Sequence, residues 1–163
     1  MSALPMLDNI WTDAKGQTRD WIAARIPHQG QMCLLARVVS ASPGGLACVA
    51  DSHLTPDNPM RLNGQLGASC GIEYAAQAMA LHGALMADQR GAERSKMGFL
   101  VSVRAVSMHV SRLDDVAGEL TVSVLCEADN GDHCVYGFSL NAGGQPLLDG
   151  RAMVMLNAPQ TSS

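Results

Sequence analysis

A long apolar helix with a single carboxylate near its start is the feature that most constrains the fold of this chain. The residues from Gly67 to Ala87 are mostly Ala, Met, Leu and Gly, and Glu73 is the only acid among them. Because each residue of a helix advances by about 100°, Glu73, Gln77 and Ala80 fall on one stripe. Apolar surroundings raise the pKa of a carboxyl group, so a buried Glu73 could donate a proton near neutral pH. The stripe therefore predicts an acid and an amide beside a slender groove; the alternative is an amphipathic helix with its one charge at the solvent edge.

The composition indicates one folded domain that binds neither nucleic acid nor membrane. Of the 163 residues, 47% are apolar and 16% charged, as in a compact protein. A net charge of −4 leaves no basic excess for sequence-independent nucleic-acid binding. The chain has neither a signal-peptide pattern nor an apolar run of the roughly 18 residues that a membrane span requires. The five cysteines form no Cys-x-x-Cys pattern and indicate reduced thiols, so we expect a cytoplasmic protein.

Hydrophobic alternation predicts two strands, one long helix and four further strands, which is the order of an α+β domain. The helix is expected from Leu66 to Ala87, and a short helix is expected near the N-terminus. A one-residue slip in the alternation predicts a β-bulge near Ala105. We expect an N-terminal extension over 1–25, a single domain over 26–157 and a loose tail over 158–163. The strands are expected at 32–41, 46–52, 101–111, 120–126, 134–140 and 147–156.

Two short motifs carry a resemblance to a known family. The segment 26–29 (IPHQ) precedes 34–38 (LLARV), and the helix carries 72–77 (IEYAAQ). In this order they resemble the hotdog-fold β-hydroxyacyl-(acyl carrier protein) dehydratases, over about residues 26–156. The loop 58–61 (NPMR) is most similar to a divergent branch from aryl-polyene pigment pathways. The resemblance implies a hotdog fold, in which an antiparallel six-stranded sheet wraps around one long central helix, and an active site between two chains.

The resemblance also assigns candidate site residues. Glu73 falls on the catalytic acid of the family and Gln77 on the glutamine one turn later, for which we expect substrate contact. The family's catalytic histidine belongs to a Gly-His-Phe-Pro motif that this chain lacks, and Pro59 stands at its position. His53 is the nearest histidine upstream, so we nominate it as the base. His28 matches an early histidine that belongs to a structural segment of the family. The remaining histidines are interpreted as surface or structural residues: His82, His109 and His133.

The start of the helix offers a possible site for a thioester carbonyl. Backbone N–H groups near Gly67 and Gly71 could polarise such a carbonyl, although the same glycines equally suit close packing of helix on sheet. The pattern from Gly67 to Gly71 also matches a nucleophile elbow around Ser69. That motif requires a preceding buried strand, which residues 61–66 do not resemble, so Ser69 is a poor candidate.

Three hypotheses for function follow. The first is a 3-hydroxyacyl-carrier-protein dehydratase with Glu73 as acid and His53, or a histidine of a partner chain, as base. The second is a hotdog thioesterase in which Glu73 activates water, and the third is a non-catalytic subunit that pairs with an active dehydratase. We expect an acyl carrier protein or coenzyme A thioester as ligand, a homodimer or heterodimer, no cofactor and no metal. Arg90, Arg94 and Lys96 either complement the end of the helix or form a docking patch for an acidic carrier protein.

Overall fold

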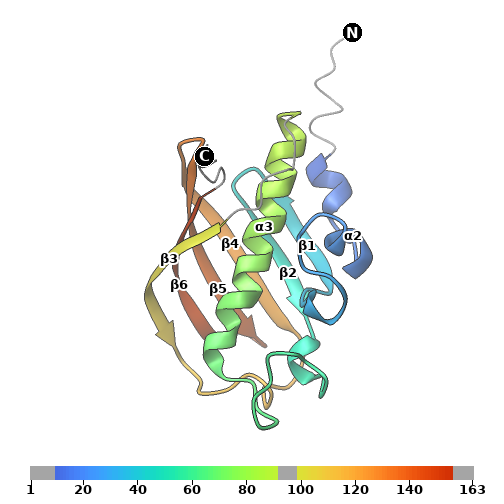
Figure 1. Cartoon of the computed structure of the whole chain (residues 1–163), viewed down its shortest axis with the longest axis vertical. Coiled ribbons are helices and arrows are strands. Elements are labelled where there is room, and N and C mark those ends of the chain that lie inside the picture. Colours follow the sequence, from blue (N-terminus) through green and yellow to red (C-terminus); the bar gives the residue numbers. More distant parts are fainter. Residues whose placement is uncertain (1–9, 92–98, 156–163) are drawn as a thin grey trace, which may run out of the picture.

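A six-stranded antiparallel sheet with the long helix α3 across one face forms the centre of the molecule (Figure 1). The computed structural model describes residues 10–91 and 99–155. The strand order is β1-β2-β4-β5-β6-β3, so β1 and β3 are the two edges. This confirms the predicted α+β hotdog fold. The strands are β1 (Arg37–Ser42), β2 (Gly45–Ala50), β3 (Phe99–Met108), β4 (Leu120–Asp129), β5 (His133–Ala142) and β6 (Gln145–Met155).

Helix α3 spans Gly71–Gln89 and is preceded by a single 3₁₀ turn, η3 (Ala68–Cys70). It therefore begins five residues after the predicted start at Leu66. The helix ends at Gln89 with Arg90 as its C-cap, and the next residue, Gly91, has a φ of 68°, in the left-handed region that glycine adopts without strain. Its sheet-facing side chains, among them Tyr74 and Leu81, are fully buried.

Strand β1 is shorter than the sequence predicts. It begins at Arg37, because residues 30–32 form a 3₁₀ turn (η1, Gly30–Met32) instead of the start of a strand. The backbone on either side of Cys33 is bonded to a side chain of α3 and is not available to the sheet: Leu34 N donates to Gln77, and Met32 O accepts from it. An apolar run can thus have the composition of a strand although some of its backbone groups bond to a side chain and not to a neighbouring strand.

The bulge predicted in β3 is confirmed. Ala105 has a φ of 55°, and the pairing of β3 with β6 shifts between Arg104 and Ser107. An extra residue of this kind reverses the alternation of inward and outward side chains. Leu100 and Val101, which precede the bulge, and Met108, which follows it, are all exposed.

The segment before Ile26 contributes to the hydrophobic core. Residues 10–14 are helical, and α2 spans Arg19–Ala23. Trp11, Ala14 and Ile22 are buried members of the core cluster. The predicted tail over 158–163 lies outside the described residues. Among the residues that are described, no helix has both the length and the apolar character needed to cross a membrane.

Candidate active site

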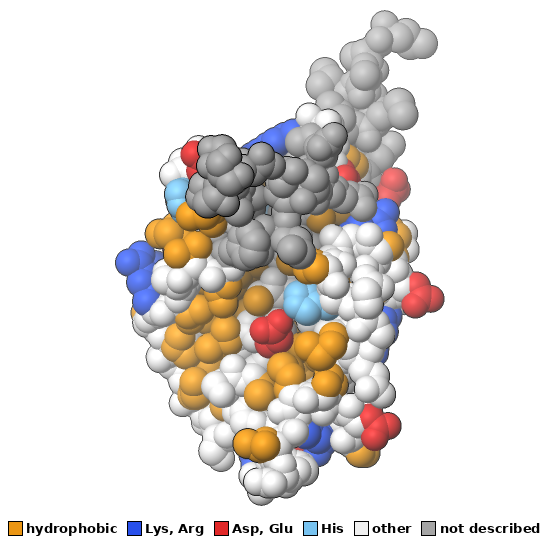
Figure 2. Space-filling model, viewed as in Figure 1, with side chains coloured by type: hydrophobic (Ala, Val, Ile, Leu, Met, Phe, Trp, Pro, Cys, Tyr) orange, Lys and Arg blue, Asp and Glu red, His pale blue; other side chains and the backbone are white. Residues whose placement is uncertain are grey.

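A carboxylate and a histidine meet on the outer face of α3. Glu73 lies in the first turn of the helix, and His28 lies in the loop between α2 and η1. His28 Nε2 is 3.2 Å from Glu73 Oε1. Figure 2 shows an acidic side chain next to a histidine near the middle of one face, with apolar side chains around them. His28, which we expected to be structural, is therefore the histidine that contacts the predicted catalytic acid.

The pair is accessible from solvent in the single chain. The Glu73 side chain is 40% exposed and that of His28 25% exposed. The carboxylate is thus more exposed in one chain than the apolar sequence around it predicts. Beyond Glu73, the same face of α3 presents small, partly exposed residues: Ala76, Ala80, Gly83 and Ala84. A thin apolar chain could lie along this face with its polar end at the pair.

Gln77 is turned towards the backbone and away from solvent. Its side chain is fully buried. Oε1 accepts a hydrogen bond from Leu34 N at 2.9 Å, and Nε2 donates to Met32 O at 2.6 Å. Both polar atoms of the amide therefore bind main-chain groups, and the expected substrate contact has no exposed amide atom to make it.

His53 lies in η2 (Ser52–Leu54), is fully buried, and its Nε2 is 3.0 Å from Val116 O. Burial lowers the pKa of His53, although nearby backbone carbonyls oppose the shift. Within the described residues, no hydrogen bond or ion pair joins His53 to Glu73. The structure therefore does not bring the two predicted catalytic residues into contact.

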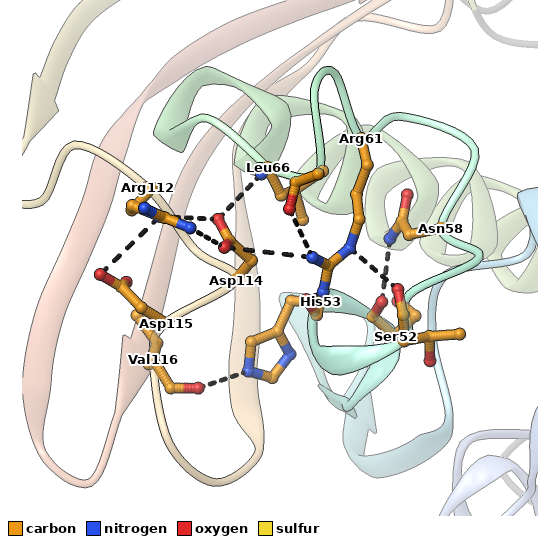
Figure 3. A network of polar contacts seen from close by, with 11 residues as sticks. Ser52, His53, Asn58, Arg61, Leu66, Arg112, Asp114, Asp115 and Val116 are labelled. Atoms are coloured by element: carbon orange, nitrogen blue, oxygen red, sulfur yellow. Dashed lines mark hydrogen bonds and ion pairs between the residues drawn. The ribbon is translucent and has the colours of Figure 1, made fainter.

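A network of ionic contacts holds the loop that leads into α3, as Figure 3 shows. Asp114 accepts hydrogen bonds from Leu66 N at 2.8 Å and from Arg112 Nε at 3.0 Å, and forms an ion pair with Arg61. The Arg112 guanidinium holds the pKa of Asp114 well below its usual range. Arg61 also donates to the carbonyls of Thr55 and Gly64 in the loop and to that of His53 in η2. This network fixes the approach to the helix start, and no motif in the sequence predicts it.

The two glycines at the helix start differ in their surroundings. A Cβ atom on Gly71 would lie 2.7 Å from Leu148 Cδ2 and 3.1 Å from Leu140 Cδ2. Gly71 N–H already donates to carbonyls of η3, so it has no spare hydrogen for a substrate. A Cβ on Gly67 would meet only Ser69 Oγ, at 4.0 Å. The contacts of Gly71 thus fit the packing alternative, while Gly67 has room around it.

Replacing Gly71 with Ala should therefore destabilise the fold by about 1–3 kcal/mol, because the added methyl group overpacks the contact with the sheet. Gly67→Ala is the matched control and should change the free energy of unfolding by less than about 0.5 kcal/mol. Urea denaturation followed by circular dichroism measures both. Equal stability of the two variants would contradict the packing role of Gly71.

The other residues considered from the sequence have structural or surface contacts. Ser69 is exposed in η3, and a loop, not a strand, precedes it. His82 is fully buried between Tyr136 Oη, at 2.8 Å, and the carbonyls of Ser42 and Pro43. His109 forms an ion pair with Asp149, and Arg90 forms one with Asp129. His133 lies in β5, and Arg94 and Lys96 fall outside the described residues.

The buried histidines predict a loss of stability in mild acid. Burial lowers the pKa of both His53 and His82, so below about pH 6.5 the unfolded chain binds more protons than the folded one. The contribution of these two histidines to the free energy of unfolding is fully present above about pH 6.5. It is lost as the pH falls through their lowered pKa values in the folded protein. The free energy of unfolding in urea should therefore be smaller at about pH 5 than at about pH 7.5, and His82→Gln should reduce the difference. An unchanged free energy between the two pH values would contradict this.

Comparisons with known proteins agree with this architecture. The family model for ApeP-like proteins, described as ApeP dehydratase, matches residues 21–162. The dehydratase heterocomplex ApeI:P from Xenorhabdus doucetiae superposes with a TM-score of 0.75 at 21% identity, over 85% of this chain and 91% of that one.

Thioesterases share the fold as well. Thioesterase superfamily member 2 from zebra fish has a TM-score of 0.60 at 14% identity, over 85% of this chain and 95% of that one. The Mus musculus protein of that name also has a TM-score of 0.60 at 14% identity, over 96% and 100%. No curated protein matches the sequence. Because the family model spans nearly the whole chain from α2 onwards, this chain belongs to the ApeP-like dehydratase family.

Proposed function

We propose that this chain takes part in the removal of water from 3-hydroxyacyl thioesters carried by acyl carrier protein or coenzyme A, in fatty-acid or polyene synthesis. The observation that carries the proposal is the Glu73–His28 contact on the outer face of α3 in a chain of this family. The elimination of water needs one group that donates a proton and one group that accepts a proton.

In the proposed reaction, a histidine removes a proton from C2 of the substrate. The C2–H electron pair forms the C2–C3 double bond, and the C3–O bond breaks. Glu73 donates a proton to the departing hydroxyl, which leaves as water. The reaction leaves a proton on the histidine and none on Glu73. With His28 as the base, transfer over the 3.2 Å contact restores both groups without exchange with bulk water.

His28 is better placed than His53 to be the base. His28 contacts Glu73 and is partly exposed, whereas His53 is fully buried and bound to a backbone carbonyl. A base must come within hydrogen-bond reach of the proton that it removes. A histidine of a partner chain, the other option left open by the sequence, remains compatible with a Glu73 side chain that is 40% exposed.

We further propose that a second hotdog chain, identical or related, covers this face by pairing along β3. The similar structure from Xenorhabdus doucetiae is a heterocomplex. Among the described strands, β3 is an edge of the sheet, and an edge strand offers backbone groups for pairing with another strand. It also exposes 42% of Leu100, 51% of Val101 and 50% of Met108.

We also propose a cytoplasmic location for this protein, because all five cysteines are free thiols, as is usual in the reducing cytoplasm.

A charge on β3 should therefore prevent assembly. We expect Val101→Lys to weaken self-association, or association with a related hotdog chain, by at least about tenfold, because it places an ammonium group in a desolvated interface. Leu125→Lys is the matched control, since Leu125 is 64% exposed on β4, away from that edge. Analytical ultracentrifugation measures both variants. Equal association by the two would contradict pairing along β3.

One assay separates the functional hypotheses. The purified chain is given a 3-hydroxyacyl and an acyl thioester of coenzyme A, alone and mixed with a second dehydratase-like hotdog chain. Formation of the conjugated enoyl thioester by the single protein supports the dehydratase, and activity only in the mixture supports a subunit that completes a shared site. Thiol release from the acyl thioester supports the thioesterase. If neither product forms in any mixture, the proposed function is overturned.

A further inference from the structure

The loop that carries His28 is attached at both ends. At its start, Gln29 Nε2 donates to Ala23 O at 2.6 Å, which ties the loop to the end of α2. At its end, the Gln77 amide binds Met32 O and Leu34 N on either side of Cys33. His28 precedes Gln29, so it lies in the segment 23–29 that the first attachment closes, and the Gln77 attachment follows it in the chain. From this segment His28 reaches Glu73.

Gln77 and Glu73 are four residues apart on α3, so one rigid helix provides both the carboxylate and the anchor of the loop. Gln77 has no exposed surface with which to touch a substrate. Its hydrogen bond from Leu34 N is buried and the one to Met32 O is partly buried. Leaving the buried Leu34 N–H unpaired is costly. Within the described residues, the Gln77 side chain bonds to the backbone that follows the His28 segment, and no hydrogen bond joins it to the side chain of His28 or Glu73.

We propose that Gln77 is a positioning residue, which holds the His28 loop against α3 and so sets the contact between His28 and Glu73. The inference rests on the proposed role of that pair. It replaces the substrate contact expected for Gln77 with an action through the backbone at Met32 and Leu34. Replacing a substrate-binding glutamine would weaken the binding of substrate. Replacing a positioning glutamine would instead alter the contact between His28 and Glu73, even in the protein without substrate.

The test is made by NMR on the free full-length chain and requires no substrate. In the wild-type background, Glu73→Gln removes a carboxylate in contact with His28 and should shift the ring resonances of His28. In a Gln77→Met background, Glu73→Gln should leave the His28 resonances unchanged, because the His28 ring no longer contacts the side chain at position 73. Exchange of the Leu34 amide hydrogen should also become about tenfold faster in Gln77→Met, since its acceptor is lost.

His82→Leu is the control. It removes another fully buried polar side chain of α3, with hydrogen bonds to other partners. It should destabilise the fold but leave both Leu34 exchange and the His28 response to Glu73→Gln as in the wild type. Gln77→Glu keeps the acceptor for Leu34 but loses the donor to Met32, and it serves if Gln77→Met does not fold.

A His28 response that persists in the Gln77 variants would overturn the inference, and so would failure of both variants to fold, which would make Gln77 a stability residue only. Absence of a response in the wild type would also overturn it. None of these results depends on dehydration. The inference can therefore fail while water loss is observed, and it can hold while the proposed function fails.

Discussion

Glu73→Gln should lower the rate of water loss from a 3-hydroxyacyl thioester by about 10²–10⁴-fold, because the amide cannot donate the proton that the departing hydroxyl needs. The substitution keeps the size of the side chain, and Glu73 is partly exposed in the single chain, so the fold should keep its stability. The measurement is kcat for enoyl thioester formation by the active form, either the chain alone or its complex with a second hotdog chain.

Glu119→Gln provides the matched control, because it makes the same change at an exposed glutamate next to β4 and away from α3. It should keep kcat within about threefold of the wild type. Full activity in Glu73→Gln would remove the acid from the mechanism. The fold would be unaffected by that result.

His28→Asn should have an effect of similar size, a fall in kcat of about 10²–10⁴-fold. Asparagine is too short to replace the Nε2 atom that lies 3.2 Å from Glu73 Oε1, and it cannot accept a proton near neutral pH. The same assay measures the effect, with thermal unfolding recorded in parallel to exclude loss of the fold.

A comparison with His53→Gln decides which histidine is the base. His53 is fully buried, so its replacement should lower the free energy of unfolding while kcat falls by less than about threefold. The opposite result, with His53→Gln inactive and His28→Asn fully active, would restore the assignment made from the sequence.

The architecture could be predicted because its signals are local. Alternation over β4 and β5 predicts which face is buried, and the phase slip at Ala105 predicts the bulge. Glu73 could be singled out because one charge in an apolar helix is unusual in any context. These inferences need no knowledge of what lies across the fold.

The histidine and the role of the glutamine could not be predicted in the same way. His28 and Glu73 are far apart in the chain, and their contact depends on a loop whose conformation is set by the buried amide of Gln77. Sequence spacing favoured His53, which lies closer to the missing motif, but spacing says nothing of burial. The apolar run before Arg37 likewise has the composition of a strand, although Met32 O and Leu34 N in this run bond to Gln77.

The rate of the double variant Glu73→Gln/His28→Asn tests the central claim most directly. If the two groups act as one unit, removing both should cost about as much in kcat as removing either, because the second change acts on a pair that is already disabled. The double variant is then expected within about threefold of the slower single variant. If the two losses multiply, so that their free energies add, the groups act independently and the pair proposed on α3 does not exist as a catalytic unit.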